Sequence, residues 1–159
     1  MDDTPKPPHG KNLRKGRVSL SNQIYLVTAV TASRALHFTP FANARLAVRC
    51  FHDKDVEHQA QTLAFVVMPD HIHWLLQLRE DGDLSGVVRL YKAKVTMKLG
   101  QNLWQRGFHD YALRSDEDMR DVAQYIIANP VRAGLGRERG RLSALGCDMV
   151  AVGAQLAAR

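Results

Sequence analysis

Two short residue patterns in this sequence of 159 residues bring together side chains that bind metal ions or act as nucleophiles. His71 and His73 are separated by one residue, and two neighbouring imidazoles can hold one metal ion. Tyr125 and Asn129 lie four positions apart and offer a hydroxyl nucleophile and an amide oxygen. Each pattern taken alone also fits a structural role, as polar strand residues for the histidines and as a core-margin tyrosine and helix-ending asparagine for the second pair.

The two histidines begin a predicted strand over residues 71–78. Side chains alternate along a strand, so both imidazoles point to one face, and Ile72 and Trp74 point to the other. Residues 62–68 predict another strand, and only a Pro-Asp turn separates it from the strand over 71–78. We therefore expect the two strands to be antiparallel neighbours.

A predicted helix that starts with the Ser-x-x-Asp pattern at 115–118 carries Tyr125. Its apolar residues recur at intervals of three and four, as in a helix that buries one stripe: Met119, Val122, Ala123, Ile126 and Ile127. Tyr125 and Asn129 are one turn apart on the edge of this stripe, where they can reach a ligand held on a sheet. Pro130 disfavours helical conformation in the residue before it, so we expect the helix to end near Asn129.

The remaining segments predict strands over 23–31 and 103–113 and helices over 42–53 and 84–100. The order strand, helix, strand, strand, helix, strand matches a ferredoxin-like α+β sandwich. We therefore predict an antiparallel sheet with helices on one face, plus an additional C-terminal helix that carries the tyrosine.

The formal net charge of +6 and the pI of about 9.6 favour a polyanionic partner such as nucleic acid. Basic residues gather in a flexible N-terminal arm over 1–20 and in the predicted helix over 84–100, which contains no acidic residue. For both segments a solvated charged surface remains the alternative. The candidate DNA-binding residues are Lys11, Arg14, Lys15 and Arg17 in the arm and Arg89, Lys92, Lys94 and Lys98 in the helix.

No apolar run approaches the ~20 residues needed to cross a bilayer, and the polar, Pro-rich start resembles neither a signal nor a transit peptide. We therefore expect a cytoplasmic protein with no membrane partner. Cys50 and Cys147 show no metal-type spacing and no disulfide pattern, so we expect buried free thiols. We expect one folded domain over 21–135 between the basic arm and a variable tail over 136–159.

Three separated segments resemble one family of enzymes. The segment VMPDHIHWLL at 67–76 resembles the HUH motif (His, hydrophobic residue, His) of single-tyrosine, IS200-like insertion-sequence transposases. The segments WQRGFHDYALR at 104–114 and YIIANPVRAGL at 125–135 resemble the REP-associated branch, whose members act on repetitive extragenic palindromes. The resemblance covers about residues 12–135, with the segments in order and at compatible spacing.

The resemblance implies an HUH endonuclease fold and a role for each candidate residue. His71 and His73 match the two histidine ligands of a divalent ion, Mg²⁺ or Mn²⁺, and Asn129 matches the third, amide-oxygen ligand. Tyr125 matches the nucleophile, which forms a covalent 5′-phosphotyrosine link. The implied partner is single-stranded or hairpin DNA, and the implied protein is a monomer or a homodimer.

The sequence departs from the family pattern in two places. Asp70 precedes the first histidine where relatives often carry Asn, and the tail after Leu135 lacks the aromatic, Ser-containing pattern of many REP-associated members. Two alternatives stay open: a non-catalytic DNA-binding module of the same fold, and a metal-dependent phosphodiester hydrolase that uses metal-bound water. A replication or conjugation relaxase shares the chemistry, but 159 residues leave no room for a helicase partner domain.

Overall fold

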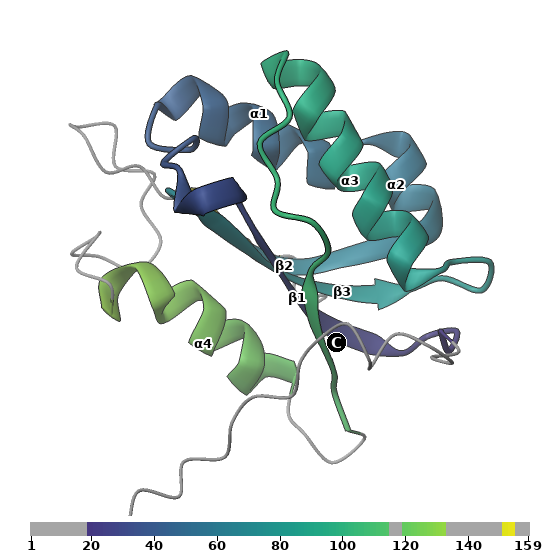
Figure 1. Ribbon diagram of the computed structural model, residues 1–159. Coiled ribbons are helices and arrows are strands. Elements are labelled where there is room, and N and C mark those ends of the chain that lie inside the picture. The colour runs from purple at the N-terminus through teal and green to yellow at the C-terminus, as the bar shows by residue number, and fades with distance from the viewer. Residues whose placement is uncertain (1–18, 115–118, 133–150, 155–159) are drawn as a thin grey trace, which may run out of the picture.

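The computed structural model of the chain describes residues 19–114, 119–132 and 151–154 (Figure 1). For residues 129–132 and 151–154 the structure describes the backbone but not the side chains. Within these ranges, no helix combines the length and the apolar character that crossing a bilayer requires.

In the described part of the chain, five strands form one antiparallel sheet in the order β4-β1-β3-β2-β5. The strands are β1 (Ile24–Val30), β2 (Ala60–Met68), β3 (His71–Leu78), β4 (His109–Ala112) and β5 (Ala151–Ala154). The first four have the arrangement of a ferredoxin-like sandwich, with β1 and β3 as central neighbours. β5 pairs with β2 at one edge, which the sequence analysis did not predict.

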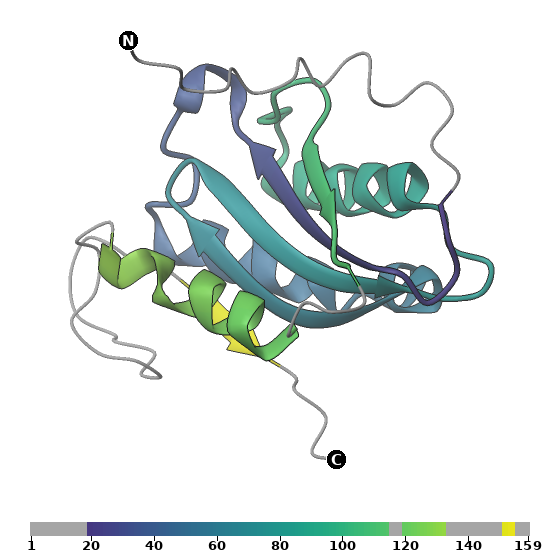
Figure 2. The same cartoon turned by 90° about the horizontal axis from the view of Figure 1, so that it is seen from below.

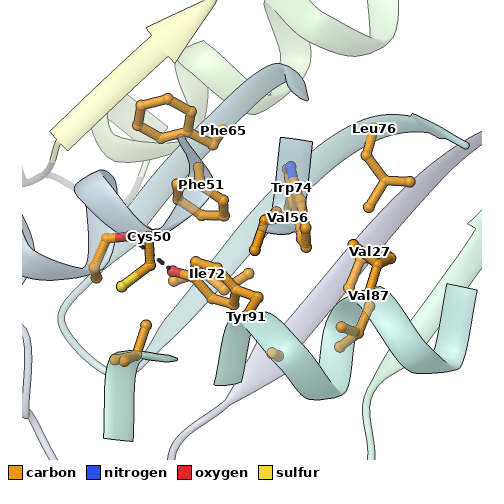
Figure 3. Packing of buried hydrophobic residues seen from close by; sticks show 14 of the residues in the cluster. Val27, Cys50, Phe51, Val56, Phe65, Ile72, Trp74, Leu76, Val87 and Tyr91 are labelled. Carbon is orange, nitrogen blue, oxygen red and sulfur yellow. Dashed lines mark hydrogen bonds between the residues drawn. The ribbon is translucent and has the colours of Figure 1, made fainter. Parts of the chain in front are cut away.

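Three helices cover one face of the sheet, as Figures 1 and 2 show: α1 (Phe41–Phe51), α2 (Lys54–Gln59) and α3 (Leu84–Leu99). They enclose the larger hydrophobic core, into which β3 points Ile72 and Trp74 (Figure 3). The ring of Phe51 stacks on that of Tyr91 with 4.4 Å between their centroids. Each such buried aromatic side chain contributes roughly 1.5–3 kcal/mol through removal from water, so this core anchors β3 from one side.

The remaining helix, α4 (Met119–Arg132), covers the opposite face (Figure 2). Its buried residues Ala123 and Ile126 pack in a second core together with Val66, Met68 and Leu75. In both views the later turns of α4 lie toward the end of the sheet where β2 turns into β3. The sheet is therefore sandwiched between α1–α3 on one side and α4 on the other.

The structure confirms the predicted fold class and most of the predicted elements. β3 spans the predicted residues, since its alternating pattern is local to the strand. At the start of α3, Asp83 accepts a hydrogen bond from the Gly86 N–H, and Gly100 ends the helix with a φ of 70°. The expected antiparallel pairing of β2 with β3 is also confirmed.

Two element predictions were wrong, and α2 was missed as well as β5. The short helix α2 was not predicted, although Asp53 caps it by accepting a hydrogen bond from the Asp55 N–H. The predicted strand over 103–113 is shorter, because Trp104 makes only an isolated bridge with Thr31 and a left-handed Gly107 precedes β4.

The helix predicted to end near Asn129 continues as α4 to Arg132. Pro130 biases the preceding residue away from the helix without forbidding it, and its missing N–H removes one internal hydrogen bond in the last turn. The predicted helix start at 115–118 lies outside the described residues.

Candidate active site

His71 and His73 lie on the face of the sheet that α4 covers. In the register of β2 and β3, His71 is opposite Met68 and His73 is opposite Val66. Both partners, and Leu75 two positions further along β3, belong to the core beneath α4. Because opposite residues of an antiparallel pair point to the same face, the two imidazoles point to that face as well.

The two imidazoles are close together and each is held at Nδ1. Their ring centroids are 4.9 Å apart, with an angle of 81° between the planes. Nδ1 of His73 lies 2.9 Å from Oγ1 of Thr28, and Nδ1 of His71 lies 2.6 Å from Oδ1 of Asp70. These hydrogen bonds leave Nε2 of each ring as the nitrogen available to a metal ion.

The protonation state of the site also suits a cation. Burial, with a smaller contribution from the charge of His71, lowers the pKa of His73 to about 4, so this ring is neutral at pH 7. Burial opposes ionisation of Asp70. The hydrogen bond and charge of His71, together with Arg34, outweigh burial and hold the pKa of that carboxyl below its ordinary value. Neutral imidazole is the form that binds metals.

A third ligand has to come from another type of residue. Among the described residues, no group of three His, Cys, Asp or Glu side chains is placed to hold a metal ion. The backbone of Asn129 belongs to α4, but the structure does not describe the side chain of this residue. Two imidazoles with free Nε2 atoms fit a divalent ion that takes its remaining ligands from amide, phosphate or water oxygens.

Tyr125 lies at the margin of the contact between α4 and the sheet. Ile126 beside it is buried, whereas Tyr125 is 53% exposed. This position agrees with the one predicted from the sequence, at the edge of the apolar stripe of α4. About half of the surface of Tyr125 is therefore open to a large substrate such as a nucleic-acid strand.

The other tyrosines differ in access. Tyr91 is fully buried in the opposite core, and its hydroxyl donates a hydrogen bond to the carbonyl of Ala47, so it cannot reach a substrate. Tyr111 is 46% exposed and is opposite Leu26, which packs against the core beneath α4. Tyr111 is therefore on the same face of the sheet as the histidine pair and is the competing candidate nucleophile.

The structure adds two residues to this face that the sequence analysis did not single out. Thr28 is opposite His73 on one side and His109 on the other, so the three residues form a row across β3, β1 and β4. A polar residue within the apolar segment 23–31 was a signal for Thr28. His109 had no such signal, because its place depends on the register of β4 with β1.

The predicted DNA-binding residues fall into three groups: those outside the described residues, those that are exposed, and those that have partners within the protein. Lys11, Arg14, Lys15 and Arg17 lie outside the described residues. Arg89 and Lys98 are exposed on α3. Nζ of Lys92 donates to the carbonyls of Gln105 and Gly107 at 2.8 and 2.9 Å, and Nζ of Lys94 lies 3.0 Å from Asp53 Oδ1 and 2.5 Å from Asp55 Oδ2. Because α3 packs on the first core, these helical cations are on the opposite side of the sheet from the histidines.

Comparison with known proteins gives matches across most of the chain. The family model described as IS200-like transposase matches residues 19–129. A protein of Haemophilus influenzae strain Rd, provisionally named a REP-associated tyrosine transposase, is 30% identical over 129 residues, which are 70% of this chain and 72% of that protein. The REP-associated tyrosine transposase of Escherichia coli strain K12 is 40% identical over 73 residues, 45% of this chain and 44% of that protein.

A solved structure is similar in fold as well as in sequence. It is described as a REP-associated tyrosine transposase bound to a REP hairpin. The match has a TM-score of 0.60 and 27% identity, and it covers 74% of this chain and 72% of the other.

Proposed function

The chain belongs to the IS200-like transposase family, in its REP-associated tyrosine branch, and from this membership we propose that it is a site-specific single-strand DNA endonuclease that also rejoins strands. The observation that carries the proposal is the position of His71 and His73. Their rings lie 4.9 Å apart on the face that α4 covers, and α4 carries the accessible Tyr125.

In this proposal His71 and His73 would hold a divalent ion through Nε2, and Asn129 would supply an amide oxygen. When bound, Mg²⁺ or Mn²⁺ supplies Lewis-acid polarisation of the scissile phosphate. Thr28 and Asp70 orient the two rings through their Nδ1 atoms, so the ligands are arranged before the substrate arrives. The neutral state of His73 means that no proton has to leave this ring first.

Tyr125 supplies the nucleophile. Its hydroxyl oxygen forms a bond to the phosphorus, and the bond from phosphorus to the 3′ oxygen of the preceding nucleotide breaks. The proton lost by the tyrosine and the proton gained by the 3′ oxygen balance, so the products are a 5′-phosphotyrosine ester and a free 3′-OH. Attack of a 3′-OH on the ester reverses the step and rejoins a strand without ATP.

The proposed substrate is single-stranded DNA that carries a hairpin. The similar solved structure is described as bound to a REP hairpin, and this chain has a net charge of +6. Besides the basic arm, Arg89 and Lys98 are the helical candidates for phosphate contact, since Lys92 and Lys94 already have partners within the protein.

A covalent protein–DNA complex separates this proposal from its two alternatives. Purified protein is incubated with labelled single-stranded oligonucleotides from the flanks of its gene and with Mg²⁺ or Mn²⁺, and the products are run on a denaturing gel. The proposal predicts cleaved strand and labelled DNA that migrates with the denatured protein. Cleavage without that complex would favour a metal-dependent hydrolase, and binding without cleavage would favour a DNA-binding module.

A further inference from the structure

Asp70 contacts two charged or ionisable neighbours at the entrance to β3. Its Oδ1 lies 2.6 Å from Nδ1 of His71, and its Oδ2 lies 3.4 Å from a terminal guanidinium nitrogen of Arg34. The side chains of Asp70 and His71 are both largely buried, whereas that of Arg34 is exposed. The three side chains thus form a chain of contacts that begins at the surface and ends at the histidine pair.

The chemistry of the two partners distinguishes His71 from His73. An ionised carboxylate offers only hydrogen-bond acceptors, so an Nδ1 at 2.6 Å from Oδ1 has to carry a proton. In a neutral ring this leaves the lone pair on Nε2. The hydroxyl of Thr28 donates or accepts, so it is compatible with either tautomer of His73. Among the described contacts of the pair, the carboxylate is therefore the one that selects a tautomer.

The backbone of Asp70 is held by the loop that follows β1. Its carbonyl accepts hydrogen bonds from the N–H and the hydroxyl of the buried Thr31, both at 2.9 Å. Two and three residues after Thr31, Ser33 and Arg34 both have a φ of 54°. Residues with side chains rarely adopt this left-handed conformation, and it occurs most often where a fold requires a particular placement.

We propose that Asp70 is a positioning residue for the metal site, which holds His71 as the Nδ1–H tautomer and so presents Nε2 to the ion, with Arg34 supporting the carboxylate. Carboxylates that receive the second N–H of a ligating histidine orient the ring and raise its basicity. This inference rests on the proposed function, because the role concerns the ion that His71 and His73 hold.

The tautomer is measured first, in metal-free protein. Long-range ¹H–¹⁵N NMR spectra of ¹⁵N-labelled wild-type protein at pH 8 in EDTA report which ring nitrogen of His71 carries the proton. We expect Nδ1–H in the wild type and a weaker preference for it in Asp70→Asn, because an amide offers a donor nitrogen as well as an acceptor oxygen. We expect a mixture of tautomers in Asp70→Ala. A wild-type His71 protonated at Nε2 would overturn the inference without touching the proposed function.

Metal affinity is measured second, by titration with Mn²⁺ followed by electron paramagnetic resonance. Asp70→Ala should weaken Mn²⁺ binding by about 10- to 100-fold, the usual range for lost partners of ligating histidines. Asp70→Asn should lose less affinity than Asp70→Ala but more than Arg34→Gln, which should lose less than about fivefold, since exposed ion pairs contribute little. Asp55→Asn is the matched control, because it removes an exposed carboxylate from an ion pair with Lys94 on the other side of the sheet.

The outcomes separate the inference from the function on which it rests. Unchanged Mn²⁺ affinity in a folded Asp70→Ala variant would overturn the positioning role while leaving the metal site intact. If Asp70→Ala does not fold, Asp70→Asn decides: a weakened Nδ1–H preference together with reduced Mn²⁺ affinity supports the role, and the wild-type tautomer with wild-type affinity would overturn it. Wild-type protein that binds no Mn²⁺ or Mg²⁺ would contradict the proposed function and, with it, the role of Asp70.

Discussion

Oγ1 of Thr28 lies 2.9 Å from Nδ1 of His73, across the antiparallel pair of β1 and β3. The half-buried ring of His73 thereby has a hydrogen-bond partner within the sheet, and its orientation is set before any ligand binds. The partner strand β1 is thus part of the candidate metal site as well as part of the fold.

Replacing Thr28 by Val tests this contact, because the change removes the hydroxyl and keeps the shape. The unpartnered Nδ1 of His73 should lower the free energy of unfolding by about 1–3 kcal/mol. Mn²⁺ affinity should fall by about tenfold. Urea unfolding and Mn²⁺ titration measure the two effects, and Thr96→Val on α3 is the control. Affinity equal to that of the control would mean that Thr28 does not orient the ring.

Removal of divalent ions should stop DNA cleavage completely. The candidate ligands are two imidazoles and an amide, which supply no charge to the phosphate themselves, so the polarising charge has to come from the ion. EDTA should abolish cleavage, and Mg²⁺ or Mn²⁺ should restore it. His71→Ala and His73→Ala should each show no restoration at ion concentrations that suffice for the control His58→Ala, an exposed histidine of α2.

Cleavage that persists after thorough chelation would contradict the role of the ion. A tightly bound zinc would point instead to the hydrolase alternative or to a structural site.

The intramolecular partners of Lys94 lead to a prediction about the salt dependence of DNA binding. Each phosphate contact on a single strand contributes about 0.7 to the slope of log K against log salt. Arg89→Gln combined with Lys98→Gln should therefore reduce the slope by about 1.4 if both exposed cations contact DNA. Lys94→Gln should leave the slope unchanged, because Asp53 and Asp55 already neutralise this ammonium group.

Fluorescence anisotropy with a hairpin oligonucleotide in EDTA measures these slopes. A Lys94→Gln variant that loses as much slope as Lys98→Gln would show that the lysine leaves its carboxylates to bind phosphate. Deletion of residues 1–17 tests the arm separately, and an unchanged slope would identify the arm as a solvated tail.

Cys50 should be an unreactive thiol that makes stability depend on alkaline pH. Burial, only partly offset by nearby Lys98 and Lys94, raises the pKa of its thiol from 9.0 to about 11. The folded state therefore favours the neutral thiol, and this contribution to stability is present below pH 9 and is lost as the pH rises from 9 to 11. Alkylation at pH 8 should be slow in folded Cys147→Ser protein and fast in urea.

The matched variant is Cys50→Ala, whose side chain does not ionise. Between pH 8 and pH 10 its unfolding midpoint should fall less than that of the parent protein. Equal falls in both proteins would contradict a raised pKa for this thiol.

The elements that the sequence predicted best are those with a local pattern. The alternation in β3 gave its bounds and placed both histidines on one face, and the apolar stripe of α4 gave its buried side. Long-range pairing had no such pattern. The acids that pair with Lys94 are Asp53, which caps α2, and Asp55 within α2, so one cation of a helix without a single acid of its own is neutralised from another element.

The same limit applies to the candidate site. His71, His73 and Tyr125 were identified from spacing and resemblance, but the row of His73, Thr28 and His109 depends on strand register, which the sequence does not specify. The contact between Asp70 and Arg34 depends on a loop with two left-handed residues that are not glycine. No residue-type rule predicts that conformation for Ser33 or Arg34.

The most direct test of the account is to locate the covalent bond to DNA. The covalent complex formed with a single-stranded substrate is digested with nuclease and trypsin, and the nucleotide-bearing peptide is identified by mass spectrometry. Cleavage after Arg120 and Arg132 places Tyr125 in a peptide of its own, and cleavage after Arg106 and Arg114 does the same for Tyr111. We expect the nucleotide on the peptide over 121–132, with loss of the complex in Tyr125→Phe and its retention in Tyr111→Phe. A nucleotide on the peptide over 107–114, or a complex that persists in Tyr125→Phe, would contradict it.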